Sequence, residues 1–230
     1  MGHSHVSCIR LVPILNHLDN TTMELIAEKA QVRTFKRGEF LYLAEQSDDS
    51  LYIVSKGKVR VYLLSDSGKE QLLRILTPGE FTGEWTLFNQ DGVHGDYAQA
   101  MVDTTICQIR QEDFQALLSD YPAISMKLLS EMSKRLEVSE KQTAKIAVDQ
   151  VGSRLAIHLV EQIQEKAAAE EGPVIVDLGM SRKDIASFLG TTPETISRKF
   201  RELEEEGLID QLKGGKVRIH DLDDLLLWGG

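Results

Sequence analysis

The sequence is poor in cysteine, with only Cys8 and Cys107 in 230 residues. Two cysteines are too few for a secreted disulfide scaffold or for a metal site made of four cysteines. No apolar run approaches the roughly 20 residues that a membrane-spanning helix needs, and His3, His5 and Arg10 interrupt the N-terminus before an apolar signal segment can form. We therefore expect a cytoplasmic protein that does not enter a membrane.

The sequence also lacks the usual signatures of an enzyme. It contains no nucleophile motif, no phosphate-binding loop and no paired acid-base residues. A metal enzyme built on a β-barrel, such as a cupin, needs several histidines and a carboxylate on its strands, whereas the β-rich part of this chain offers only His94. We predict that the protein is not an enzyme and has no catalytic residues.

The first half of the chain has the pattern of a small β-rich domain. Hydrophobic residues make up 42% of the sequence and charged residues 27%, and 230 residues suit two modest domains better than one. From about Thr34 to Arg110, short β-type runs alternate with glycine turns, which suggests a barrel or sandwich. The runs are 40–43, 50–54, 59–64, 71–76 and 98–110, with helices expected at 19–31 and 111–119. We expect a sensor domain over 1–121.

A long helix is predicted from Pro122 to about Ile146, within a segment 122–147. One seam recurs along it at steps of three and four residues. Its members are Leu129, Met132, Leu136, Ser139, Thr143 and Ile146. The helix either packs on its own β-rich domain or pairs with a second copy in a homodimer. The dimer explains better why Ser139 and Thr143 interrupt the apolar row, since polar seam residues can fix register or face a ligand.

The remaining residues, 148–230, have the pattern of a winged helix-turn-helix domain. A break over 148–153 that contains Gly152 predicts a hinge between domains. A helix over 154–169 and a short strand over 174–177 are expected to follow it.

Capping signals mark the two helices of the helix-turn-helix. Ser181 with Asp184 forms a capping-box pattern at the start of a helix that ends at Gly190. Thr192 can cap the next helix, with Pro193 at its first position. The two strands of the wing are predicted at 208–212 and 216–220, joined by two glycines.

The second of these helices has the residues of a DNA reader. Although the net charge is −10, the segment 181–201 carries five cations and two anions. Arginine can grip guanine with two hydrogen bonds and glutamate can accept from cytosine, so we assign base reading to Glu194, Ser197 and Arg198. The predicted phosphate contacts are Lys183, Thr192, Lys199, Arg201, Lys213 and Lys216. The alternative is a solvated charged face, which the caps, turn and wing together disfavour.

The order of these parts resembles the Crp/Fnr superfamily of transcription regulators over nearly the whole chain. The resemblance rests on the segments 79–88, 132–138, 149–155 and 181–190. The segment Glu-Thr-Ile-Ser-Arg at 194–198 matches the Fnr branch, whereas the Crp branch carries Gly in place of Ser197.

The resemblance implies an α+β fold. Its parts are an N-terminal cyclic-nucleotide-binding-like β-roll (a double-stranded β-helix), a dimerisation helix and a winged helix-turn-helix. It also implies a homodimer that binds double-stranded DNA at a TTGAT-like palindrome, with RNA polymerase as a partner.

The effector site departs from the cyclic-nucleotide branch of the superfamily. There an Arg-Ser pair clamps the phosphate, but the matching residues here are His94 and Gly95. The phosphate thus loses its bidentate partner, and we do not expect cyclic AMP as a cofactor. The candidates for an effector pocket are Gly83, Glu84, His94, Ser139 and Thr143, of which the first two also have structural uses in a turn.

The cysteines depart from the oxygen-sensing branch, in which four of them hold an iron-sulfur cluster. Two cysteines cannot complete such a site, so no cluster is expected. The pattern is similar to the cluster-less FNR-like proteins of lactic acid bacteria, which implies a thiol-disulfide switch between Cys8 and Cys107. Two alternatives to the switch stay open: an inert, buried Cys107 with a disordered Cys8, or a weak metal site made of His3, His5 and Cys8. The regulator would then be controlled by a small molecule or metal bound in the N-terminal domain, or would bind DNA constitutively.

Overall fold

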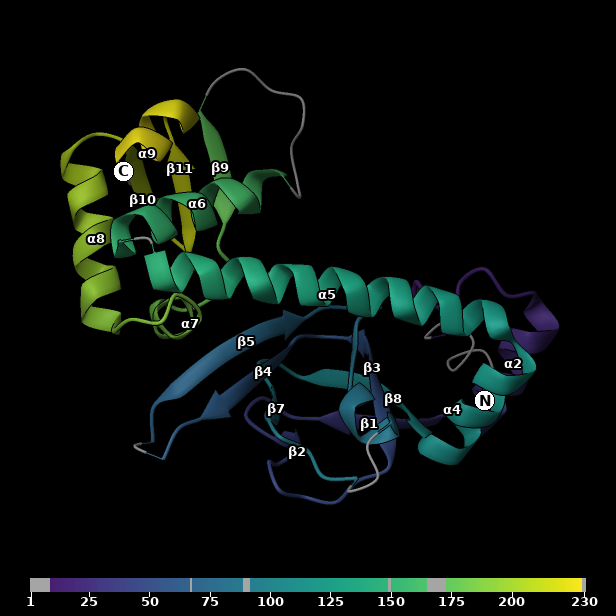
Figure 1. Cartoon of the computed structure of the whole chain (residues 1–230). Helices are drawn as coiled ribbons and strands as arrows, with labels where there is room; N and C mark the ends of the chain where they lie inside the picture. The colour runs from purple at the N-terminus through teal and green to yellow at the C-terminus, as the bar shows by residue number, and fades with distance from the viewer. Residues whose placement is uncertain (1–8, 67, 89–91, 149, 165–172, 229–230) are drawn as a thin grey trace. The chain divides into compact units, whose positions relative to one another are not determined.

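The structure is a computed structural model of the chain (Figure 1). It describes residues 9–66, 68–88, 92–148, 150–164 and 173–228. Residue contacts divide the chain into two compact units, Met1–Leu136 and Glu137–Gly230. No helix in the described ranges is long and apolar enough to cross a membrane. The unit boundary falls inside a helix, and the predicted three-part division stays a prediction.

The N-terminal unit is built from two four-stranded antiparallel sheets, in the orders β1-β8-β3-β6 and β2-β7-β4-β5. Its strands are β1 (Gln31–Phe35), β2 (Phe40–Tyr42), β3 (Ser50–Lys56), β4 (Val59–Leu64), β5 (Glu70–Leu76), β6 (Phe81–Thr82), β7 (Tyr97–Ala100) and β8 (Thr104–Arg110). Gly57 makes the tight β3–β4 turn with a φ of +99°, and a Cβ there would lie 2.8 Å from the Asp103 carbonyl oxygen. The α+β fold with a sheet-rich N-terminal roll is confirmed.

Burial on both faces of the first sheet explains the continuous apolar sequence of β3. Tyr52 and Val54 join the cluster inside the roll, to which both sheets contribute. Leu51 and Ile53 join a second cluster, together with residues of the helices. The helices of this unit are α2 (Asn20–Lys29), α3 (Glu84–Phe88), α4 (Gln111–Asp120) and the first part of α5 (Pro122–Val148).

Several elements of the roll differ from the sequence prediction. The run over 98–110, predicted as one strand, is β7 and β8 separated by the bend at 101–103. β1 and the two-residue β6 were not predicted; in β1 only Phe35 is buried, so no alternation marks that strand. α3 was also missed, because five residues are too few to show a helical period.

The long helix predicted from Pro122 is present as α5. Ile124 and Leu128 are buried in the second cluster, and Met132 packs against it half-buried. Leu129 and Leu136 are 62% and 60% exposed. The predicted seam therefore divides: Met132 contacts the core of its own unit, while Leu129 and Leu136, seven residues apart, share an outward face. The side chain of Ile146 lies outside those that the structure describes.

The C-terminal unit has the winged helix-turn-helix architecture that the sequence predicts. Its three-stranded sheet has the order β10-β11-β9. Its elements after α5 are α6 (Val151–Gln164), β9 (Val174–Asp177), α7 (Arg182–Phe188), α8 (Pro193–Glu205), β10 (Ile209–Leu212), β11 (Lys216–Ile219) and α9 (Leu222–Trp228). The sequence prediction missed α9.

The break predicted over 148–153 is narrower in the structure, where α5 ends at Val148 and α6 begins at Val151, and Gly152 lies outside it. This glycine lies in the first turn of α6 instead. A Cβ at this position would be 3.3 Å from Cζ3 of Trp228 in α9. Close packing of α6 against the indole, rather than a break in the chain, is therefore the physical reason for glycine here.

Candidate functional site

The starts of α7 and α8 are fixed by the caps that the sequence predicts. Ser181 and Asp184 form a reciprocal capping box: the Asp184 N–H donates to Ser181 Oγ (3.1 Å) and the Ser181 N–H donates to Asp184 Oδ2 (3.2 Å). Gly190 follows α7 with a φ of +67°. The Thr195 N–H then donates to Thr192 Oγ1 (3.3 Å), which caps the start of α8.

One face of α8 belongs to the core of the C-terminal unit. Ile196, Phe200 and Leu203 are at most 1% exposed, as their helical spacing predicts. Because these three side chains fix the rotation of α8, the residues on the opposite side of the helix face outward.

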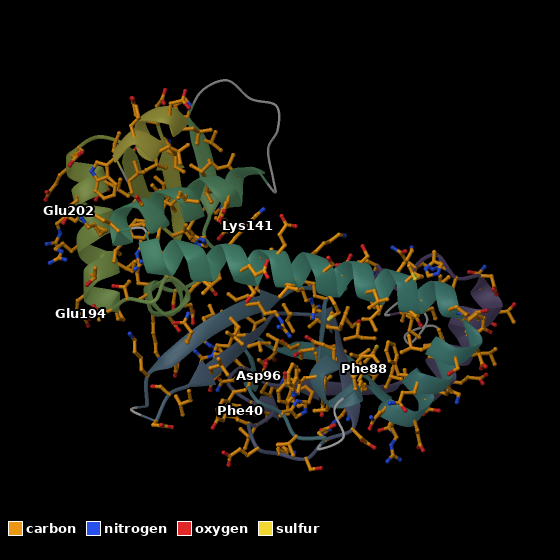
Figure 2. All side chains as sticks on the ribbon, in the orientation of Figure 1. Phe40, Phe88, Asp96, Lys141, Glu194 and Glu202 are labelled. Atoms are coloured by element: carbon orange, nitrogen blue, oxygen red, sulfur yellow. The ribbon has the colours of Figure 1, made fainter. Side chains whose placement is uncertain are left out.

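The outward face carries all three predicted base readers. Glu194, Ser197 and Arg198 are exposed, and Figure 2 shows Glu194 near one end of α8 and Glu202 farther along it. The Arg198 side chain is 67% exposed, with Nε 3.6 Å from Glu202 Oε1. The Ser197 hydroxyl donates to the Pro193 carbonyl (2.8 Å). An acid, a hydroxyl and a guanidinium thus stand on the first two turns of one helix, where base edges could be read.

The predicted phosphate contacts fall into two groups. Most are exposed around the ends of α7 and α8 and at the β10–β11 turn; they are Lys183, Thr192, Arg201, Lys213 and Lys216. Lys199 differs. Its side chain is 27% exposed, its Nζ lies 2.5 Å from Glu202 Oε2, and the same atom is 5.2 Å from the ring centroid of Trp228. Lys199 is therefore held against its own domain, which argues against a phosphate contact there.

In the N-terminal unit, Glu84 is the centre of a charged network. Its Oε1 accepts from Arg74 Nη2 and from Arg135 Nη1, each at 2.8 Å. Arg135 also donates to the Phe81 carbonyl (3.0 Å) and lies over the Phe81 ring, 4.2 Å from its centroid. Arg74 reaches Thr82 Oγ1 at 3.3 Å. This network ties β5, β6 and α3 to α5 within one unit.

His94 lies beside this network and is 2% exposed. Its ring stacks on Tyr42 with centroids 3.5 Å apart, and its Nε2 has no hydrogen-bond partner among the described residues. Burial lowers the pKa of His94, while the carboxylates of Asp48 and Glu84 oppose that shift. Burial also raises the pKa of Asp96, which Figure 2 shows among the strands of the roll.

The five effector-pocket candidates belong to two units, and each unit is described by itself. Gly83 has a structural role in its turn, because its φ is +87° and a Cβ there would collide with the Ser50 carbonyl oxygen. Ser139 and Thr143 are exposed and belong to the other unit, where the Thr143 hydroxyl donates to the Ser139 carbonyl (2.9 Å).

Glu84 and His94 are the two candidates that the structure brings close together. The neighbours that sequence reasoning missed are Tyr42, Asp48, Arg74, Thr82, Asp96 and Arg135. No local motif marks them, because they come from six different segments of the chain.

The proposed redox and metal residues can be placed only in part. Cys107 is 0% exposed in β8, opposite Val32 of β1 and Ile53 of β3. His3, His5 and Cys8 lie outside the described residues. Within the described ranges, no three His, Cys, Asp or Glu side chains gather as a metal site would require.

Comparison with known proteins identifies the family. Residues 32–121 match the model for the cyclic nucleotide-binding domain, and residues 153–228 match that for the Crp-like helix-turn-helix domain. The chain is 33% identical over 225 residues to the probable transcriptional regulator flp of Lacticaseibacillus casei, covering 98% of each chain. The chain belongs to the Crp/Fnr family of transcription regulators.

Other Crp/Fnr proteins are similar over most of their length. The transcriptional activator protein Anr of Pseudomonas protegens is 30% identical, covering 96% of this chain and 90% of Anr. A CooA variant from Carboxydothermus hydrogenoformans superposes with a TM-score of 0.77 at 23% identity, covering 88% of this chain and 89% of that one, which supports the fold alone. This Crp/Fnr chain is therefore a DNA-binding transcription regulator, of a family and fold that are not those of enzymes.

The residues of this Crp/Fnr regulator do not fit a cyclic nucleotide, which is the ligand implied by the name of the family that residues 32–121 match. A cyclic phosphate is an anion and needs cationic partners. The buried ring of His94 has a lowered pKa, and Gly95 has no side chain. The guanidiniums of Arg74 and Arg135 are already paired with Glu84.

Proposed function

We propose that this regulator binds a palindromic DNA site with TTGAT-like half-sites and reads its bases through Glu194, Ser197 and Arg198. The observation that carries the proposal is the orientation of α8, whose apolar residues are all buried while these three side chains are exposed. Arg198 can donate two hydrogen bonds to guanine O6 and N7, and Glu194 can accept one from cytosine N4.

Cations around the reading helix support the proposal. Lys183, Arg201, Lys213 and Lys216, together with the Thr192 hydroxyl, are exposed at the ends of α7 and α8 and at the wing turn. Phosphate contacts of this kind position a protein on the duplex without reading sequence. They give a locally basic surface to a chain whose net charge is −10.

A homodimer is the second part of the proposal, because a palindrome presents the same half-site twice. The outward face of α5 offers Leu129 and Leu136 to a second copy, and Met126, at 67% exposure, extends the same face. Crp/Fnr regulators are generally dimeric, and exposed apolar side chains at this spacing are typical of a helix-helix seam. We further propose that the DNA-bound dimer contacts RNA polymerase.

For the signal, we propose a thiol-disulfide switch between Cys8 and Cys107. Cys107 shares its buried cluster with Ile9, the residue that follows Cys8 in the sequence. Joining two thiols as a disulfide releases two protons and two electrons, which a cellular disulfide or peroxide would accept. Such a bond would tie the start of the chain to β8 in the oxidised state only.

A second candidate signal is a small molecule bound near His94. The atoms His94 Nε2, Glu84 Oε2, Asp48 Oδ1 and Arg74 Nε are all buried without a hydrogen-bond partner in the described structure. Buried polar atoms are normally satisfied, so several of them in one region favour a polar ligand or ordered water there.

The test is binding to a TTGAT-type palindrome by reduced and oxidised protein, with mass spectrometry of the Cys8 and Cys107 peptides. The proposal predicts a bond between the two cysteines and a severalfold change in affinity. Cys8→Ser is the control, and it should bind equally under both conditions. Unchanged affinity with the bond formed would reject the switch and favour a ligand near His94. Binding no tighter than to a scrambled duplex would reject the site itself.

A further inference from the structure

Three residues connect the wing to the reading helix. Gln211 of β10 donates its backbone N–H to Oε1 and its side-chain Nε2 to Oε2 of Glu204 in α8, at 2.9 and 3.0 Å. Its Oε1 accepts from Arg182 Nη2 at 2.7 Å. Gln211 thereby joins the first residue of α7, the reading helix and the wing in one hydrogen-bonded group.

Arg182, one of the two partners of Gln211, is itself held in place. The Arg182 guanidinium carbon lies 3.2 Å from the ring centroid of Phe200, a core residue of α8. Burial lowers the pKa of Arg182, while Glu204 opposes that shift. The hydrogen bonds from Gln211 lower the pKa of Glu204, so this carboxylate stays charged in its place.

The topology explains why the wing needs such a connection. β10 is the edge strand of the sheet and, within the described part of the chain, pairs only with β11. The backbone N–H of Gln211 points to the open edge, where Glu204 takes the place of a neighbouring strand. Lys213 follows Gln211 by two residues, and Lys216 pairs with Leu212 across the turn. Any tilt of β10 relative to α8 would therefore move both lysines.

We propose that Gln211, Glu204 and Arg182 are positioning residues that hold the wing at a fixed angle to α8. In that position Lys213 and Lys216 meet phosphates of the same half-site that α8 reads. The inference rests on the proposed phosphate contacts of the wing. These contacts are electrostatic and involve the phosphate backbone of the DNA. Loss of the wing position should therefore weaken binding equally on all sequences.

The test measures DNA affinity over a range of salt concentrations. Lys213→Ala/Lys216→Ala should reduce the slope of log K against log salt by about four in a dimer, roughly one per lysine. Gln211→Ala should reduce it by about one or more, with the ratio of palindrome to scrambled-duplex affinity unchanged. Glu205→Gln, which removes the neighbouring charge on α8, should leave the slope unchanged. Thermal unfolding checks that each variant is folded.

A reciprocal exchange provides the rescue. Gln211→Glu alone should lower the slope, since it places two carboxylates together. Combined with Glu204→Gln it should restore the slope, because one carboxylate and one amide again face each other.

A normal slope in Gln211→Ala, with a reduced slope in the double lysine variant, would overturn the positioning role and leave the proposed function intact. A normal slope in the double lysine variant would overturn both this inference and the wing contacts on which it rests.

Discussion

The charged network around Glu84 makes a quantitative prediction about stability. Glu84 is 16% exposed, and its partners Arg74 and Arg135 are 29% and 24% exposed. Leaving a fully buried partner unpaired costs about 3–5 kcal/mol. Since about a quarter of each arginine side chain is still exposed, we expect Glu84→Gln to lower the free energy of unfolding of the N-terminal unit by about 2–3 kcal/mol.

Urea titration followed by hydrogen exchange of peptides from the N-terminal unit separates this unit from the other one. The expected loss corresponds to a midpoint lower by about 1–2 M urea. Glu131→Gln is the matched control: its partner Lys134 is 67% exposed, so the cost should stay below about 1 kcal/mol. A midpoint shift in Glu84→Gln no larger than that in Glu131→Gln would refute the reasoning.

Three further predictions concern caps, charge and core. Ser181→Ala removes the capping-box hydroxyl and should lower the thermal midpoint of the C-terminal unit through a loss of about 1 kcal/mol. Burial raises the folded-state pKa of Asp96, so the wild-type protein should gain stability as the pH falls through that pKa. Asp96→Asn should lack this gain when thermal unfolding is measured from neutral to acidic pH. Leu203→Ala, at 0% exposure, should cost about 2–5 kcal/mol in urea unfolding, and Leu227→Ala, at 78%, should cost under about 0.5 kcal/mol.

The helix-turn-helix was predictable because its signals are local. The caps at Ser181 and Thr192 lie within three residues of the groups that they bind. The apolar residues of α8 recur at the helical period, so burial of one face also fixes which side chains are exposed. Interactions between residues so close in the chain can be predicted from a single sequence.

The surroundings of His94 were not predictable for the opposite reason. Tyr42 lies 52 positions from His94 in the chain, and Arg135 lies 51 positions from Glu84. Only the pairing of the strands brings such residues together, and the sequence pattern contains no signal for that pairing. The same holds for the contact between Arg182 and Gln211, 29 positions apart.

Packing between elements also explains two features that the sequence pattern did not indicate. Gly152 was interpreted as part of a break between domains, but it lies in α6, where a Cβ would be 3.3 Å from Cζ3 of Trp228. Met132 was assigned to the dimer seam, and in the structure its half-buried side chain packs against the core of its own unit; its place in a seam stays a prediction. In both cases the deciding neighbour lies on a different element, which a periodicity argument cannot include.

Affinity for single-base variants of the palindrome tests the central claim, which is that α8 reads DNA through Arg198. Wild type should lose about 1–3 kcal/mol of binding free energy when the guanine of TTGAT is replaced. Arg198→Ala should bind the original and the altered site equally and should remain a dimer in solution. Wild-type preference for guanine in Arg198→Ala would contradict the account.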